Sequence, residues 1–142
     1  MTVAAEAIEA IRRHAADTYP NECCGALIGS AAAVEEAFAL ANTTDEGPRR
    51  RFLIRPQEYR AAETRASARR SALVGFYHSH PDAPPRPSQY DLDHAWPNLS
   101  YIIVSVENGR PAEMRSWRLR PDRSAFDEEP FISRMEPCRT ES

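Results

Sequence analysis

Three of the four histidines of the chain lie in one short stretch, residues 78–94, which also holds three aspartates. The stretch contains His78, His80, Asp82, Asp91, Asp93 and His94. His78 and His80 are separated by one residue and directly follow an apolar run, 72–77, that predicts a buried strand. If the extended backbone continues, their imidazoles point to the same side of that strand. Two neutral imidazoles on one side supply half of a tetrahedral zinc site, so the stretch predicts a metal centre.

A third ligand is needed, and it should be a carboxylate or another imidazole. The candidates are Asp82, Asp91, Asp93 and His94. Residues 88–96 predict a short helix, on which Asp91 and Asp93 differ by about 200° around the axis and face nearly opposite ways. His94 lies one turn from Asp91 and can share its face. Spacing alone therefore leaves Asp91, Asp93 and His94 open as the third ligand.

The kind of metal site follows from the residues near it. Structural zinc sites have four protein ligands and usually include cysteine, whereas catalytic sites have three protein ligands and a water. No cysteine lies near the histidine pair in the sequence, which favours a catalytic metal. Zinc lowers the pKa of its bound water to about 7. Such a site also needs a carboxylate outside the metal ligands to carry a proton, and a donor for the oxyanion.

The composition is that of one globular domain. The chain has 142 residues, 42% of them hydrophobic, which is enough for one core. Its net charge of −3 gives no indication of nucleic-acid binding. No apolar run approaches the ~20 residues that span a membrane, and the first residues show no secretory pattern. Three cysteines without a CxxC argue against a disulfide framework and favour a reducing, cytoplasmic location.

Elements on both sides of the histidine pair must position it. Apolar runs predict strands over residues 25–30, 34–42, 51–54, 72–77, 100–106 and 111–119. The spacing of apolar side chains and the positions of prolines predict helices over 2–20, 56–70 and 88–96. Residues 43–50 predict an exposed loop, and 120–142 are polar except for a patch at 130–132. This order predicts an α/β or α+β sheet with helices packed against it.

Residues 78–91, HSHPDAPPRPSQYD, resemble the motif of the JAMM (MPN+) metalloprotease family, in which His-Ser/Thr-His-Pro is followed by Ser-x-x-Asp. The matching residues are His78, Ser79, His80, Pro81, Ser88 and Asp91. The family also has a glutamate before its first strand, and PNECCGALIG, residues 20–29, supplies Glu22 in that setting. The resemblance, to the compact bacterial and archaeal branch, runs from the first helix to about residue 119.

The resemblance implies a fold, a cofactor and a set of site residues. The fold is the cytidine-deaminase-like α/β fold of MPN/JAMM domains, with a mixed β-sheet flanked by helices. By analogy with the family, His78, His80 and Asp91 bind Zn²⁺, with a water in the fourth position. Glu22 is similar to the general base and proton shuttle of the family, and Ser88 to the residue that donates to the oxyanion.

Each of these residues also has an ordinary structural interpretation. Ser88 and Asp91 match a capping box at the start of a helix, and a serine there can cap the helix and still present its hydroxyl. Glu22 taken alone is an ordinary surface acid. Cys23 and Cys24 are expected to pack in the core next to Gly25 rather than to act as nucleophiles.

Other polar residues are expected to lie outside the site. His14 and the arginines at 49–51 are expected in solvent, and His94 at the surface or behind the metal ligands. The prolines that follow His80, at 84, 85 and 87, are expected to stiffen the loop that leads to Ser88. They would hold the serine and the following aspartate in register with the imidazoles.

The resemblance also implies a substrate class. Family members hydrolyse an amide or isopeptide bond after the C-terminal glycine of ubiquitin or a ubiquitin-like protein. Residues 1–125 are expected to form a single catalytic domain, and 126–142 a partly flexible C-terminal extension. This domain is too short for the usual insertions that grip ubiquitin. We therefore expect a partner like those of the compact bacterial relatives, a ubiquitin-like sulfur-carrier protein with a C-terminal Gly-Gly.

Three other functions compete with this one. A catalytically weak MPN scaffold that binds a protein partner usually lacks the histidines, serine or aspartate that this chain retains. A zinc nucleoside deaminase is expected to carry H-x-E and P-C-x-x-C, and neither occurs in the sequence. A DNA-repair relative is disfavoured by the acidic balance of charge. The peptidase interpretation is therefore preferred, with the scaffold as its alternative.

Overall fold

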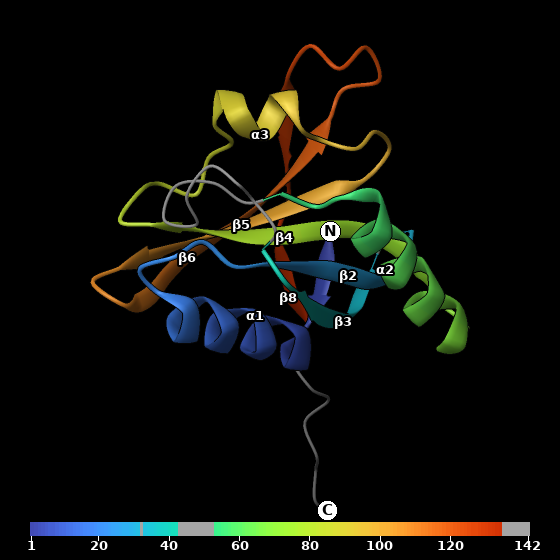
Figure 1. Cartoon of the computed structure of the whole chain (residues 1–142), viewed down its shortest axis with the longest axis horizontal. Helices are drawn as coiled ribbons and strands as arrows, with labels where there is room; N and C mark the ends of the chain where they lie inside the picture. Colours follow the sequence, from blue (N-terminus) through green and yellow to red (C-terminus); the bar gives the residue numbers. More distant parts are fainter. Residues whose placement is uncertain (32, 43–52, 135–142) are drawn as a thin grey trace, which may run out of the picture.

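The computed structural model describes residues 1–31, 33–42 and 53–134, which form one mixed eight-stranded sheet and three helices (Figure 1). The helices are α1 (Ala5–Thr18), α2 (Pro56–Ala68) and α3 (Gln89–Asp93). The strands are β1 (Thr2–Ala4), β2 (Cys24–Ser30), β3 (Ala33–Leu40), β4 (Ala72–Pro81), β5 (Ser100–Glu107), β6 (Arg110–Leu119), β7 (Phe126–Glu129) and β8 (Ile132–Arg134). Their order across the sheet is β7-β6-β5-β4-β2-β3-β1-β8. The predicted α/β architecture, a mixed sheet flanked by helices, is confirmed.

The strand that carries the histidine pair lies at the centre of the sheet. β4 pairs antiparallel with β2 on one side and parallel with β5 on the other. The second half of β4 and nearly all of β5 are buried, which explains their almost continuous apolar composition. β4 also continues past residue 77 to Pro81, so His78 and His80 stand on a paired strand rather than on a loop.

The helices cover both faces of the sheet, and Figure 1 shows α1 below it and α3 above it. On the first face, Ile11 of α1 belongs to a buried cluster with Tyr77 of β4 and Ile102 of β5. On the second face, Ala62 of α2 belongs to a cluster with Phe76 of β4. Because successive side chains of a strand point to opposite faces, Phe76, His78 and His80 of β4 lie on the side of α2 and α3.

Two boundaries near the start of the chain and before α2 were predicted wrongly. The helix predicted over 2–20 begins only at Ala5, because Thr2–Ala4 forms β1, which is parallel to β3 and β8. The strand predicted over 51–54 is absent at residues 53–54, and residues 51–52 lie outside the described residues. The predicted loop at 43–50 with its arginines, and Cys138, also lie outside them.

The polar segment after β6 also joins the sheet, although its sequence predicted no strand. Residues 126–129 form β7 at one edge of the sheet, paired antiparallel with β6. Residues 132–134 form β8 at the other edge, paired parallel with β1. Both strands are short and mostly polar, so the apolar pattern carries no signal for them. The boundary between a domain over 1–125 and an extension over 126–142 stays a prediction.

In the described part of the chain, no helix is both long enough and apolar enough to cross a membrane. The cytoplasmic location expected from the cysteine content stays a prediction. Two of the three cysteines, Cys23 and Cys24, are buried free thiols.

The backbones of β4 and β5 approach each other closely at Gly75. A β-carbon added to Gly75 would lie 1.9 Å from the backbone carbonyl oxygen of Ser100. A backbone oxygen in a paired strand cannot rotate away, so the two strands would have to separate. We expect Gly75→Ala to lower the free energy of unfolding by about 3 kcal/mol, as measured by urea denaturation.

Gly109→Ala is the matched control for this substitution. Gly109 lies in the turn between β5 and β6 with a φ of +84°, and an added β-carbon would meet Tyr19 at an ordinary 3.6 Å. The left-handed backbone alone should cost about 1 kcal/mol. If Gly75→Ala costs no more than Gly109→Ala, the close approach of β4 and β5 does not limit the stability of the protein.

Candidate metal centre

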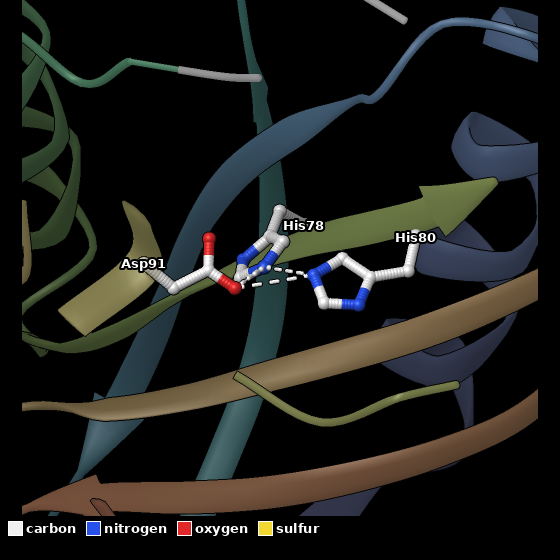
Figure 2. A group of neighbouring side chains, drawn as sticks. All are labelled: His78, His80 and Asp91. Carbon is white, nitrogen blue, oxygen red and sulfur yellow. Dashed lines mark hydrogen bonds and ion pairs between the residues drawn. The ribbon is translucent and has the colours of Figure 1, made fainter. Parts of the chain in front are cut away.

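Three ligand atoms from β4 and α3 meet in a buried triangle (Figure 2). Nε2 of His78 lies 3.1 Å from Nε2 of His80 and 3.2 Å from Oδ2 of Asp91. Nε2 of His80 lies 3.1 Å from the same Oδ2. The three residues are only 1%, 7% and 8% exposed, respectively. The even spacing along β4 brings the two imidazoles to one face, as predicted, and α3 brings the carboxylate to them.

The triangle is more easily explained by a shared cation than by hydrogen bonds. If both imidazole nitrogens donate to Asp91, two N–H groups oppose each other across the 3.1 Å contact between His78 and His80. If only one donates, the lone pair of the other nitrogen faces the Asp91 oxygen, and if neither donates, three lone pairs converge without a proton. Ligand atoms of a tetrahedral zinc site, each about 2.05 Å from the metal, are about 3.3 Å apart. The three atoms therefore fit a divalent cation bound by two imidazoles and one carboxylate.

The tautomer of His80 is suited to metal binding. Its Nδ1 lies 2.8 Å from the carbonyl oxygen of Pro84, which can only accept a hydrogen bond. Nδ1 must therefore carry the proton and donate it. In the neutral ring this leaves the lone pair on Nε2, and Nε2 is the nitrogen that faces His78 and Asp91. A backbone carbonyl behind a histidine is a common way in which proteins orient a metal ligand.

The carboxylate of Asp91 is held by the start of α3. Ser88 is the N-cap residue, and its Oγ accepts a hydrogen bond from the backbone N–H of Asp91 at 3.1 Å. The backbone N–H of Ser88 donates to Oδ2 of Asp91 at 2.9 Å. This reciprocal pair is the predicted capping box. Because the Ser88 oxygen accepts from Asp91, its own hydroxyl hydrogen remains able to donate elsewhere, and the residue is exposed.

Burial and the neighbouring imidazoles set the charge of the triangle. Burial raises the pKa of Asp91, but the charge and hydrogen bonds of His78 and His80 outweigh it and hold that pKa well below its ordinary value. Burial lowers the pKa of His78, which keeps its imidazole neutral. For His80 burial is the largest cause and lowers the pKa, but the hydrogen bond and charge of Asp91, the Pro84 carbonyl and the charge of Glu22 together outweigh it and leave the pKa raised. The site therefore contains an ionised carboxylate and at least one neutral imidazole.

Glu22 lies beside this triangle, just before β2. In the antiparallel pair of β2 and β4, Cys24 is opposite His78. Two hydrogen bonds join Cys23 to Ser79. The backbone N–H of Cys23 donates to Oγ of Ser79 at 2.9 Å, and the backbone N–H of Ser79 donates to the carbonyl oxygen of Cys23 at 3.2 Å. Continuing this register puts Glu22 opposite His80, and directly opposed side chains lie on the same face of a sheet.

The surroundings of Glu22 agree with that placement. Its residue is 7% exposed, and its negative charge is one of the causes that raise the pKa of His80. The interpretation of Glu22 as an ordinary surface acid is therefore wrong, since a surface carboxylate would be exposed to water. A buried carboxylate next to a candidate metal ligand is suited to carrying a proton.

Of the ligands that spacing left open, only Asp91 reaches the imidazoles within the described residues. Asp93 lies on the exposed side of α3, where it accepts a hydrogen bond from Gln89 at 2.7 Å. His94 is exposed, stacks on Tyr90, and its Nδ1 lies 2.9 Å from the Tyr90 carbonyl. Asp82 accepts a hydrogen bond from Tyr19 at 2.5 Å and another from the Asn108 backbone at 2.9 Å.

Cys23 and Cys24 pack in the core, as predicted, on opposite faces of the sheet. Burial raises the pKa of Cys23 to about 11 and that of Cys24 to about 12. Both thiols are therefore protonated at neutral pH and are poor nucleophiles. The prediction that His14 lies in solvent was wrong, because it is half-buried and its Nδ1 lies 2.7 Å from the Tyr77 hydroxyl.

An open groove lies beside Ser88. Its volume is about 320 Å³, and it is lined by Arg86, Pro87, Ser88, Gln89, Leu92, Trp117, Ala125 and Phe126. No sequence pattern indicated a role for Trp117, whose indole Nε1 donates to the carbonyl oxygen of Pro85 at 3.0 Å. The two residues are 32 positions apart, so no local pattern could have indicated this contact.

Comparison with known proteins identifies relatives along most of the chain. The family model described as prokaryotic homologs of the JAB domain matches residues 4–120. Tail tip assembly protein K of Escherichia phage N15 is 40% identical over 125 residues, covering 88% of this chain and 47% of that protein. The chain thus spans about half the length of the phage protein.

Two further relatives match over most of their own length. Desampylase of Haloferax volcanii is 36% identical over 114 residues, which cover 75% of this chain and 81% of that protein. The CysO-cysteine peptidase of Mycobacterium bovis is 26% identical over 120 residues, which cover 84% of this chain and 82% of that protein.

Solved structures share the fold. The solution structure of a protein from Desulfitobacterium hafniense has a TM-score of 0.81 and 32% identity, with 98% of this chain and 96% of that chain covered. A JAB1/MPN domain protein from Archaeoglobus fulgidus has a TM-score of 0.61 at 18% identity, with 94% of this chain and 98% of that chain covered. The predicted fold of MPN/JAMM type is therefore confirmed.

Proposed function

Because the chain belongs to the family of prokaryotic homologs of the JAB domain, we propose that it is a JAMM-type metallopeptidase with His78, His80 and Asp91 as its metal ligands. One observation carries the proposal, namely the buried triangle of their ligand atoms, 3.1–3.2 Å apart, with a buried Glu22 beside it. Two imidazoles and one carboxylate suit Zn²⁺ in a site with three protein ligands. When bound, Zn²⁺ polarises a carbonyl and lowers the pKa of water.

The side chains around the triangle would supply the remaining chemistry. Glu22 would accept a proton from the attacking water and pass it to the departing nitrogen, so that an amide and a water become a carboxylic acid and an amine. Ser88 would donate its hydroxyl hydrogen to the carbonyl oxygen as negative charge develops there. The burial of Glu22 and the hydrogen bond that Ser88 accepts from the Asp91 backbone support these two roles.

The role of Ser88 can be tested by removing only its hydroxyl. We expect Ser88→Ala to lower kcat about 100-fold, because one donor to the developing oxyanion is lost. The helix cap is lost as well, which should cost about 1 kcal/mol of stability. The backbone N–H that binds Asp91 remains, so the zinc content should change little. The measurement is kcat together with zinc per chain.

Ser88→Thr is the control, since threonine keeps a hydroxyl that can both cap α3 and donate. It should retain most of the activity that Ser88→Ala loses. Full kcat in Ser88→Ala at normal zinc content would exclude the donor role and leave Ser88 as a helix cap alone.

For the substrate, we propose the C-terminal Gly-Gly tail of a ubiquitin-like protein, of the sulfur-carrier class. Two relatives named desampylase and CysO-cysteine peptidase both match most of this chain, which supports a peptidase that acts on a ubiquitin-like protein. A glycine tail has no side chains to clash and can lie extended beside a sheet. In this proposal the tail lies in the open groove lined by Ser88, the residue whose hydroxyl would donate to the oxyanion.

The experiment that tests this function uses the zinc-loaded full chain. Ubiquitin-like proteins that end in Gly-Gly, each extended by a cysteine, a short peptide or a lysine-linked protein, are incubated with it. Mass spectrometry should show release of the extension directly after the second glycine. The same sample treated with a chelator should release nothing. No cleavage of any extended carrier would overturn the proposed substrate.

A second candidate function is that of a catalytically weak scaffold that binds a protein partner. It is favoured by one observation, the 40% identity to a protein named for tail tip assembly. The scaffold predicts that carriers bind without being cleaved and that Glu22 can be replaced without loss. The peptidase predicts cleavage that depends on Glu22, so a single set of kinetic measurements separates the two.

A further inference from the structure

The loop between β4 and α3 contains three prolines, at positions 84, 85 and 87. Proline has no backbone N–H, so at these positions the loop can be fixed only through its carbonyl oxygens or through packing. The loop separates two of the candidate metal ligands, His80 and Asp91. Whatever fixes its carbonyl groups therefore also influences the geometry of the metal centre.

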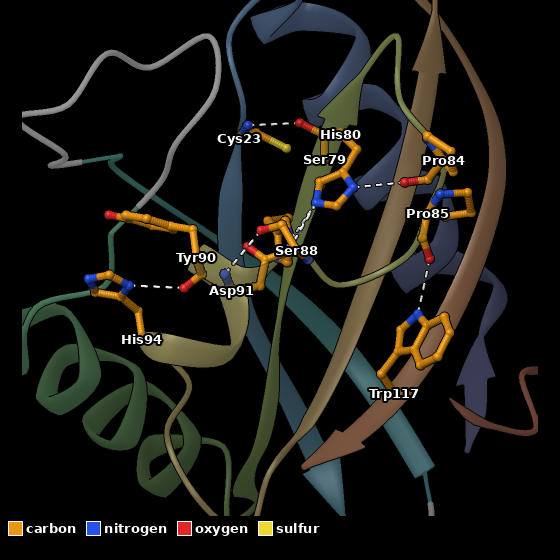
Figure 3. A network of polar contacts seen from close by, with 11 residues as sticks. Cys23, Ser79, His80, Pro84, Pro85, Ser88, Tyr90, Asp91, His94 and Trp117 are labelled. Carbon is orange, nitrogen blue, oxygen red and sulfur yellow. Dashed lines mark hydrogen bonds and ion pairs between the residues drawn. The ribbon is translucent and has the colours of Figure 1, made fainter. Parts of the chain in front are cut away.

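Two neighbouring carbonyls of this loop are hydrogen-bonded, as Figure 3 shows. The Pro84 oxygen accepts from Nδ1 of His80 at 2.8 Å and from the backbone N–H of Arg86 at 2.8 Å. The next oxygen, that of Pro85, accepts from the indole Nε1–H of Trp117 at 3.0 Å. The indole N–H is the only polar hydrogen of that side chain.

The two carbonyls are mechanically connected. Only the φ and ψ torsions of Pro85 lie between them, and the proline ring fixes φ near −65°. Once Trp117 holds the Pro85 oxygen, little freedom remains for the Pro84 oxygen. The direction of the Pro84 oxygen in turn determines where Nδ1 of His80 must point, and hence where its Nε2 points.

Trp117 is well placed to act as a fixed anchor. It lies within β6, opposite Tyr101 of β5 and Glu128 of β7, so its backbone is paired on both sides. Its side chain is half-buried, and Pro85 is buried. The indole therefore links the proline loop to the rigid part of the sheet.

We propose that Trp117 is a positioning residue for the metal centre, acting through Pro85 and Pro84 to orient the His80 imidazole. This role rests on the proposed function as a metallopeptidase, but it can be measured without a substrate. Loss of the indole N–H should leave the loop free to shift, so that the Nε2 atom of His80 no longer points steadily at the metal.

Trp117→Phe tests the role, because phenylalanine keeps an aromatic ring but has no N–H. Metal-free protein is titrated with Zn²⁺ against a chelator of known affinity, and with Co²⁺ to record its visible absorption spectrum. We expect the affinity for Zn²⁺ to fall about five- to tenfold. We also expect a changed Co²⁺ spectrum, since that spectrum reports the arrangement of the ligands.

Trp96→Phe is the matched control, since Trp96 is the other tryptophan of the chain and packs on Tyr59 of α2, with 4.7 Å between ring centroids. It should leave the Zn²⁺ affinity and the Co²⁺ spectrum as in the unmodified protein. An equal change in both variants would indicate general loosening and overturn the positioning role.

The remaining outcomes separate the two proposals. If the unmodified protein binds Zn²⁺ and Trp117→Phe binds it equally well with the same Co²⁺ spectrum, the positioning role is wrong and the metallopeptidase proposal stands. A rise in KM for a cleaved carrier with unchanged Zn²⁺ affinity would instead make Trp117 a substrate contact. If the unmodified protein binds no Zn²⁺, both proposals fail.

Discussion

Glu22→Gln is expected to lower kcat by about 10²- to 10⁴-fold while the protein keeps its full zinc content. The substitution keeps the shape of a side chain that is 7% exposed but removes its capacity to accept a proton. General acid–base catalysis by one positioned side chain contributes an effect of this size. Because Glu22 is not among the three atoms of the triangle, the metal should remain bound. The measurements are kcat with a cleaved carrier and zinc per chain by elemental analysis.

A matched substitution far from the site controls for the loss of a charge. Glu9 lies on α1, and its side chain is 65% exposed in an ion pair with Arg13. Glu9→Gln should leave kcat and zinc content unchanged, since exposed pairs of this kind contribute little. If Glu22→Gln keeps normal activity, Glu22 is not the base. If it loses zinc, its role is to support the metal ligands.

A loss of activity in Glu22→Gln must also be distinguished from a general loss of folding. Burying a neutral amide in place of a carboxylate next to His80 removes a negative charge that raises the pKa of that imidazole. Because a neutral amide costs less to bury than an ionised carboxylate, the variant should still fold, and its thermal transition should remain cooperative. A loss of kcat together with a normal transition and normal zinc content isolates the missing proton acceptor.

The central strands of the fold could be predicted from the sequence because their signals are local. β2, β5 and the second half of β4 are buried on both faces, the apolar runs in these strands are visible in the sequence, and α2 begins with a proline at its first position. The spacing of His78 and His80 is also a local signal, since side chains two positions apart on a strand lie on the same face. These features needed no knowledge of distant partners.

The edges of the sheet could not be predicted in the same way. β1, β7 and β8 are three or four residues long, and they exist only through pairing, β1 and β8 with strands far along the chain and β7 with the preceding strand β6. Such short segments have no periodicity long enough to read. β1 was absorbed into the helix that follows it, because Val3 continues the apolar spacing of α1 while in fact it pairs with Val34.

Contacts between distant residues limited the prediction of the site in the same way. His14 looked solvated on its helix, because the Tyr77 hydroxyl that it meets is 63 residues away. The third ligand could not be chosen by spacing, because the rotation of α3 about its axis depends on tertiary packing. The resemblance to a known family selected Asp91, and the capping box at Ser88 explains physically how that carboxylate is turned toward the imidazoles.

His80→Ala is expected to remove stoichiometric zinc, because it leaves only His78 and Asp91 as protein ligands. A structural zinc site with four ligands contributes about 10–16 kcal/mol in total, so one ligand is worth roughly 3 kcal/mol, or about a hundredfold in affinity. Elemental analysis after dialysis should therefore find about one zinc per chain before the substitution and almost none after it. Activity toward any carrier should be lost together with the metal.

Thermal unfolding gives a second measurement of the contribution of His80 to zinc binding, and this measurement does not depend on activity. Zn²⁺ at 100 times its dissociation constant should stabilise the unmodified protein by about 2.7 kcal/mol, which raises its Tm, and should leave the Tm of His80→Ala nearly unchanged. His94→Ala is the matched control, because His94 is exposed, stacks on Tyr90 and is not one of the three ligand residues of the triangle. It should bind Zn²⁺ and gain stability as the unmodified protein does. Normal zinc content in His80→Ala, or its loss in His94→Ala, would mean that the metal is not held by the triangle of His78, His80 and Asp91.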